Sequence, residues 1–115
     1  MDVQLRKGIL ELCVLAALRE KDSYGYQIIR DISQVVEISE STLYPILRRM
    51  ELGGAVESYQ IPYNNRLRKY HHLTPQGQRI LADFAQEKKQ LVAILDYITG
   101  GNTDESGTIF ESTQT

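Results

Sequence analysis

The sequence predicts a mainly α-helical fold with one small β-hairpin, and three observations lead to this prediction. Apolar residues recur at helical spacing in three segments before residue 54. Two strand-like segments follow at 56–63 and 66–73. A Thr-Pro pair at 74–75 then opens a last helical segment. The expected order is therefore three helices, a hairpin and a long final helix.

The first two helices are expected at residues 1–19 and at 24 to about 35. A broad apolar face on the first indicates that it is covered on two sides. Asp22 or Ser23 can cap the second helix, because both side chains accept hydrogen bonds from free N–H groups. The residues expected on its buried face are Tyr26, Ile29 and Ile32.

The third helix is expected to start at a Ser39 or Ser41 cap and to end at Gly53-Gly54, where glycine permits a left-handed residue. Its apolar stripe consists of Leu43, Ile46, Leu47 and Met50. Pro45 lies inside this pattern and removes one backbone hydrogen bond. The residues alone therefore predict a local kink or a late helix start there.

The hairpin is expected to turn at Asn64-Asn65, because asparagine tolerates positive φ. Pro62 cannot donate a ladder hydrogen bond, so either its strand is an edge strand or Pro62 lies near the end of that strand. Thr74 should cap a single final helix that runs to about Thr99. Three helices followed by a hairpin form a winged helix-turn-helix, with the hairpin as the wing.

Along the final helix Phe84, Leu91 and Ile98 are spaced seven residues apart, with Leu95 beside them. This spacing resembles a short coiled-coil seam, which Glu87 and Lys88 interrupt. An isolated helix offers these side chains no partner. We therefore expect a homodimer whose dimerisation residues are Phe84, Leu91, Leu95 and Ile98.

Composition excludes several classes of function. The chain has 115 residues, one cysteine and a net charge of −2, which suits one ordinary globular domain without an internal disulfide. It carries no glycine-rich phosphate loop, nucleophile elbow or metal-ligand pair. We expect no enzyme activity, catalytic residue, metal or cofactor. We also expect Cys13 to be buried, and His71 and His72 to be surface or interface histidines near the wing, on opposite faces of a strand.

Positive charge is concentrated in the wing although the whole chain is slightly acidic. No acidic residue lies between Glu57 and Asp83, whereas four cations fall there: Arg66, Arg68, Lys69 and Arg79. Cations at a hairpin tip suit phosphate contacts, although edge hairpins also carry charge for solubility. Thr42, Tyr44 and Arg48 can project from the third helix toward a major groove, although every amphipathic helix has a polar face.

Three segments of the chain resemble the PadR family of transcriptional regulators: DSYGYQIIRDI at 22–32, SESTLYPILRRMELGGAVES at 39–58 and RLRKYHHLTPQGQRIL at 66–81. The resemblance spans about residues 5–98 and implies the short subfamily with a single C-terminal helix. It also places Pro45 within the recognition helix. The residues that it implies at the DNA are Tyr24, Ser41, Thr42, Tyr44 and Arg48.

The expected organisation is a DNA-binding domain at 1–73, a dimerisation helix at 74–100 and a disordered tail at 101–115. The expected function is a cytoplasmic repressor, without a membrane segment, that binds double-stranded DNA as a homodimer. Its expected wing contacts are Asn64, Asn65, Arg66, Arg68 and Lys69. A winged-helix protein-interaction module without DNA binding is the alternative. A small aromatic effector, held by Tyr97, Phe84 and the first helix, is a further candidate partner.

Overall fold

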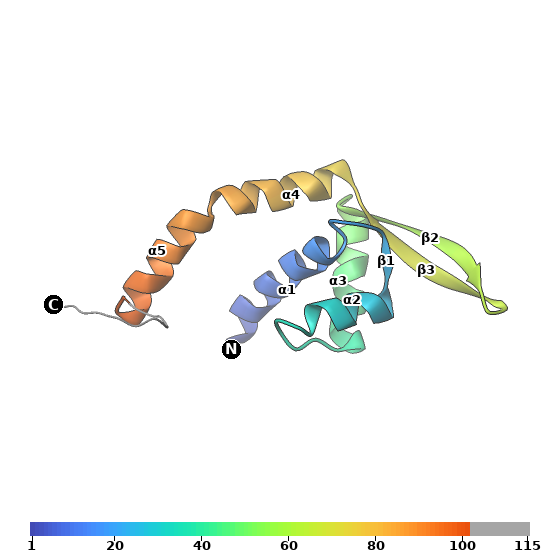
Figure 1. Ribbon diagram of the computed structural model, residues 1–115, viewed down its shortest axis with the longest axis horizontal. Helices are drawn as coiled ribbons and strands as arrows, with labels where there is room; N and C mark the ends of the chain where they lie inside the picture. The colour runs from blue at the N-terminus through green and yellow to red at the C-terminus, as the bar shows by residue number, and fades with distance from the viewer. Residues whose placement is uncertain (102–115) are drawn as a thin grey trace. The chain divides into compact units, whose positions relative to one another are not determined.

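The computed structural model describes residues 1–101, so nearly all of the expected tail lies outside the described residues. The chain divides into two compact units, Met1–Leu81 and a second unit from Ala82 onward. The first unit contains three helices, a small sheet and the start of a fourth helix (Figure 1). The mainly helical winged arrangement predicted from the sequence is confirmed.

Helix α1 (Val3–Ala17) begins at Asp2, whose carboxylate accepts hydrogen bonds from the N–H groups of Gln4 and Leu5 at 3.0 and 3.2 Å. These bonds satisfy two of the free donors at the helix start. The helix packs its apolar face into the core of the first unit. Cys13 is half-buried against that core, and burial raises the pKa of its thiol.

The segment after α1 differs from the prediction. Strand β1 (Ser23–Tyr24) precedes a short helix α2 (Gly25–Ile32), whose N-cap is Tyr24 without a side-chain cap bond. The prediction that Asp22 or Ser23 caps this helix was therefore wrong. Tyr26 is also 61% exposed, because the buried positions of this register are Gly25, Ile28 and Ile32.

Helix α3 (Glu40–Leu52) runs through Pro45 without a late start. Ser39 occupies the N-cap position but makes no side-chain cap bond, and its hydroxyl lies 3.0 Å from that of Ser41 instead. Gly54 adopts φ +88°, the left-handed conformation expected just after the helix. The predicted apolar stripe is confirmed, with Leu43, Ile46 and Leu47 buried.

Strands β2 (Val56–Tyr63) and β3 (Arg66–Leu73) form the predicted hairpin, in antiparallel register from Val56 opposite Leu73 to Tyr63 opposite Arg66. Asn64 and Asn65 have φ values of 50° and 65°, which suit a type I′ turn. The sheet has three strands in the order β1-β3-β2, so β2 is an edge strand as predicted. Strand β1 was not predicted.

The Leu-Thr-Pro-Gln-Gly segment joins the wing to helix α4 (Pro75–Gln86). The Thr74 hydroxyl donates to the Gly54 carbonyl at 2.6 Å and accepts from the Gly77 N–H at 3.1 Å. A Cβ on Gly77 would lie 2.5 Å from Leu73 Cδ1 and still closer to the Ala55 carbonyl. Only glycine therefore lets the start of α4 pack against the base of the wing.

The core of the first unit joins side chains from all three of its complete helices with the base of the sheet. Each is less than 9% exposed. The set consists of Leu10, Val14, Leu15, Leu18, Ile28, Ile32, Ile38, Leu43, Ile46, Leu47, Ala55, Val56 and Leu73. This shared core fixes the relative positions of α2, α3 and the wing base.

The predicted single C-terminal helix is two helices, α4 and α5 (Lys88–Thr99). Glu87 is the N-cap of α5, with φ −92° and ψ −1°, and its N–H donates to the Phe84 carbonyl, one residue short of the α-helical partner. The break falls where polar Glu87 and Lys88 interrupt the apolar pattern. Gly100, with φ +89°, ends α5 as predicted. Within residues 1–101, no helix is long and apolar enough to cross a membrane.

Candidate nucleic-acid interface

One face of α3 is free of the core and carries polar side chains. Ser41, Tyr44 and Arg48 are all exposed there, three or four residues apart, so they lie along one side of the helix. Thr42, at the start of the helix, is half-buried, and its hydroxyl accepts a hydrogen bond from the Ser39 hydroxyl at 3.3 Å. The exposed face therefore offers a hydroxyl, a phenol and a guanidinium in one row.

The two adjacent arginines of α3 have different environments. Arg49 forms an ion pair with Glu11 of α1, with Nη2 and Oε2 2.5 Å apart, and its Nε donates to the same oxygen at 3.1 Å. Arg48 takes part in none of the ion pairs of residues 1–101. Its charge is therefore available to an external anion, whereas that of Arg49 ties α3 to α1.

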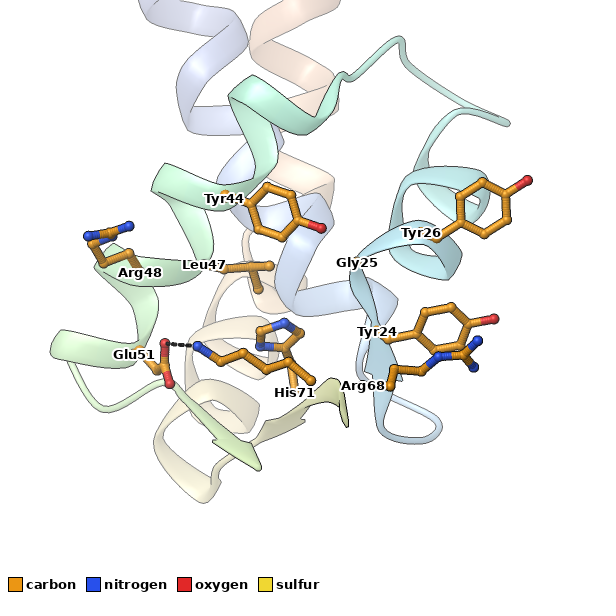
Figure 2. Close-up of a pocket in the computed structure, with 10 residues that line it drawn as sticks. Tyr24, Gly25, Tyr26, Tyr44, Leu47, Arg48, Glu51, Arg68 and His71 are labelled. Carbon is orange, nitrogen blue, oxygen red and sulfur yellow. Dashed lines mark ion pairs between the residues drawn. The ribbon is translucent and has the colours of Figure 1, made fainter. Parts of the chain in front are cut away.

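A groove of about 880 Å³ lies between α3, the start of α2 and strand β3. Figure 2 shows the residues that line it: Tyr24, Gly25, Tyr26, Tyr44, Leu47, Arg48, Glu51, Arg68, Lys69 and His71. Three cations face one carboxylate, so the groove is net positive. A positive groove beside a helix face is suited to the phosphate backbone of a nucleic acid.

Tyr44 lies across the groove with its hydroxyl toward Gly25 (Figure 2). A Cβ on Gly25 would come within 3.1 Å of Tyr44 Cζ and closer still to its hydroxyl oxygen. The absence of a side chain at Gly25 thus allows α3 and the start of α2 to approach. The glycine between two tyrosines was visible in the sequence, but its partner on α3 was not.

Lys69 and Glu51 connect the wing to the end of α3. Lys69 Nζ lies 3.9 Å from Glu51 Oε1, and both side chains are partly exposed. The carboxylate offsets part of the lysine charge, which makes Lys69 a weaker anion site than an unpaired cation. Glu51 was not among the residues predicted for the site.

His71 lies at the floor of the groove and is 3% exposed, so its prediction as a surface residue was wrong. Its Nδ1 lies 2.9 Å from the Ser58 hydroxyl, and Ser23 is its register partner on β1. Burial lowers the pKa of His71, Lys69 lowers it further, and Glu51 acts in the opposite direction. The imidazole is therefore held neutral near pH 7.

The tip of the wing forms a second, smaller feature. Asn64, Asn65 and Arg66 are exposed and line a shallow hollow of about 400 Å³ together with Pro62, Tyr63 and Leu67. The two positive-φ asparagines present Arg66 at the first position of β3. Arg66 takes part in none of the ion pairs within the described part of the chain.

Arg68 is stacked between two aromatic rings. Its guanidinium carbon lies 3.9 Å from the centroid of Tyr24 and 3.6 Å from that of Tyr63. Such stacking occupies the faces of the guanidinium and leaves its edges for hydrogen bonds. Arg68 and Lys69 point to opposite faces of β3, as the strand alternation predicted.

The structure brings only part of the predicted set together. Five members meet in the groove: Tyr24, Tyr44, Arg48, Arg68 and Lys69. Ser41 and Thr42 lie at the start of α3, and the other three lie at the wing tip. Among residues 1–101, no group of three or more His, Cys, Asp or Glu side chains could hold a metal ion.

Comparison with known proteins finds similarity to a family of transcriptional regulators. The model of the transcriptional regulator PadR-like family matches residues 14–83. An uncharacterised protein X of Lysinibacillus sphaericus is 31% identical over 100 residues, which cover 83% of this chain and 92% of that protein.

Two solved structures are similar in fold. A PadR family transcriptional regulator from Eggerthella lenta has 31% identity and a TM-score of 0.74, covering 87% of this chain and 89% of that one. Bacillus subtilis PadR, solved in complex with operator DNA, has 24% identity and a TM-score of 0.62, covering 67% of this chain and 46% of that one.

Proposed function

This chain belongs to the PadR-like family of transcriptional regulators, and on this premise we propose that it is a homodimeric repressor of a pseudo-palindromic operator. Each subunit places α3 in a major groove and its wing on the flanking backbone, with half-sites about 34–36 Å apart. The family consists of regulators and not of enzymes. The operator complex of Bacillus subtilis PadR, which shares the fold, supports the proposal.

The observation that carries the proposal is the exposed row on α3 beside a net positive groove. Arg48 is the cation of that row, and it takes part in no ion pair among the described residues. An arginine can bond guanine in a bidentate manner. Tyr44, Ser41 and Thr42 would set the register of the helix on the DNA. Arg48 is therefore the proposed base-reading residue.

The wing supplies contacts without sequence information. Arg66 at its tip is the proposed phosphate anchor, and the exposed Asn64 and Asn65 adjoin it. Tyr24 occupies the N-cap position of α2 at the edge of the groove and is a candidate contact to the DNA backbone. Lys69 can contribute a phosphate contact only in competition with Glu51.

The dimer rests on the apolar side chains of α4 and α5. Phe84, Leu91, Leu95 and Ile98 are 43%, 37%, 50% and 69% exposed, and α5 has no buried residue. Exposed apolar surface of this kind favours a partner subunit. Light scattering at micromolar concentration should give twice the chain mass, and a monomer would contradict this part of the proposal.

A small aromatic effector is proposed for the same unit. Tyr97 of α5 is 88% exposed and Phe84 is 43% exposed, so both rings can stack with a ligand. A thermal-shift screen with planar aromatic compounds tests this idea. If no compound raises the melting temperature, regulation does not use these rings.

The DNA proposal is tested by selecting duplexes from a randomised library of about three helical turns. Arg48→Ala should reduce the preference for the enriched duplex over a scrambled one by about 1–3 kcal/mol per half-site. Arg49→Ala is the matched control. It should leave that preference unchanged, because the Arg49 guanidinium is already paired with Glu11 of the same chain.

The wing is tested by its salt dependence. Arg66→Ala should weaken binding to the enriched and to the scrambled duplex by the same factor. It should also make the slope of log K against log salt shallower by about one unit per lost phosphate contact. If Arg48→Ala also weakens both duplexes alike, Arg48 is a phosphate anchor and not a base reader. If the wild-type chain enriches no duplex, the DNA-binding proposal fails.

A further inference from the structure

Asp22 makes two hydrogen bonds that no capping role explains. The Tyr59 hydroxyl donates to Asp22 Oδ2 at 2.5 Å, and His72 Nδ1 donates to Asp22 Oδ1 at 2.8 Å. Tyr59 belongs to β2 and His72 to β3, whereas Asp22 immediately precedes β1. One carboxylate therefore connects the segment before α2 to both strands of the wing.

These bonds favour the ionised carboxylate. The Tyr59 hydrogen bond lowers the pKa of Asp22 most, followed by the His72 hydrogen bond. The pKa of the Tyr59 phenol is raised for the same reason. Across neutral pH the Asp22 carboxylate is thus a charged acceptor with two donors.

The contact continues from Asp22 to the wing tip as a stacked column on one face of the sheet. The Tyr59 ring stacks on Tyr70 at 5.9 Å, and Tyr70 meets the edge of Tyr24 at 5.4 Å. Arg68 then lies over Tyr24 and Tyr63. We define the column as Tyr59, Tyr70, Tyr24, Arg68 and Tyr63. It links the N-cap of α2 to the end of β2.

We propose that Asp22 is a positioning residue for DNA binding, which acts by holding this column and hence the wing against the start of α2. The inference rests on the proposed function. Tyr24 and Arg68 belong both to the column and to the lining of the groove, so displacing the column changes the groove. Asp22 itself lines no part of that groove, so a contribution from it would act through the column.

A positioning role and direct charge repulsion by Asp22 predict opposite changes in DNA affinity when the carboxylate is removed. A carboxylate near a phosphate-binding surface repels DNA, so removing it should tighten binding if repulsion were its main effect. A positioning role predicts weaker binding instead. Glu57 provides the matched control, because it is exposed and its register partner is the same His72.

The test compares Asp22→Ala with Glu57→Ala on the enriched and scrambled duplexes described above, in a salt series. Asp22→Ala should weaken binding of the enriched duplex about tenfold, from two lost hydrogen bonds discounted for their exposure. Its salt slope should stay that of the wild type, because no phosphate contact is lost. Glu57→Ala should bind as tightly as the wild type or slightly more tightly.

Tyr59→Phe removes one donor and keeps the ring, so it tests the same hydrogen bond through a smaller change than Asp22→Ala. It should also weaken binding to the enriched duplex. The double variant should lose less binding free energy than the sum of the losses in the two single variants. Tighter or unchanged binding in Tyr59→Phe, or an Asp22→Ala effect equal to that of Glu57→Ala, would overturn the proposal. The wild-type preference and the Arg48 result test the proposed function separately.

Discussion

The contact between Gly25 and Tyr44 gives a prediction that separates binding from stability. In Gly25→Ala the new methyl group would lie 3.1 Å from Tyr44 Cζ and closer still to its hydroxyl, so one of the two must move. The Tyr44 side chain is 46% exposed and can rotate toward solvent. Alanine also favours a helix over glycine by up to about 1 kcal/mol. The free energy of unfolding should therefore change by less than about 1 kcal/mol.

DNA binding should respond more strongly than stability. If the Tyr44 hydroxyl bonds a phosphate, its displacement costs about 1.5–2 kcal/mol, or roughly tenfold to thirtyfold in affinity. Binding isotherms and thermal melts of Gly25→Ala, Tyr44→Ala and the double variant measure both quantities. The double variant should bind like Tyr44→Ala alone, because both changes remove the same contact. Additive losses, or a Gly25→Ala chain that no longer folds, would refute the reasoning.

Three other predictions concern the wing base and the dimer. Leu91→Asp should halve the mass seen by light scattering and weaken operator binding with it, whereas a dimer that persists would show that α5 is not the interface. Gly77→Ala should lower the free energy of unfolding by about 1–3 kcal/mol in a chemical melt, because the methyl group meets the Ala55 carbonyl, a backbone atom that cannot rotate away. Since burial lowers the folded pKa of His71 below its unfolded value, its contribution to stability is present above about pH 6.5 and is lost as the pH falls. His71→Gln should therefore flatten the fall in melting temperature between neutral and mildly acid pH, and an unchanged pH profile would contradict this.

Features that depend on local chemistry were predictable from the sequence. The Asn64-Asn65 turn and the Thr74 cap each follow from residues next to one another in the chain, and the structure has both. The apolar stripe of α3 was predictable for the same reason. The family resemblance placed Pro45 inside that helix, where the local rule on proline alone allowed a late start.

Features that depend on distant partners were not predictable. Strand β1 exists because it pairs with β3 almost fifty residues later, with Ser23 opposite His71. The same pairing buries His71 and turns Asp22 from a candidate cap into a partner of Tyr59. The chain breaks at Glu87 into two helices, where the sequence had predicted a single helix with an interrupted apolar seam.

The candidate site shows the same division. Tyr44 and Arg48 on α3 and the cationic wing followed from helical and strand periodicity, whereas Ser41 came from the family resemblance and the predicted Thr42 is half-buried. The pairing of Arg49 with Glu11, and of Lys69 with Glu51, required the folded chain. Because Arg49 is paired within the chain, Arg48 is the better candidate of the two α3 arginines for reading a DNA base.

Whether this chain reads a DNA sequence is tested most directly by the ratio of its affinities for specific and for scrambled DNA. Wild-type protein should be titrated against the most enriched duplex and a scrambled duplex of equal composition, at a fixed salt concentration near 0.15 M. We expect the enriched duplex to bind at least about 10³-fold more tightly than the scrambled one. A ratio near one at measurable affinity would contradict it, as would the failure of both duplexes to bind.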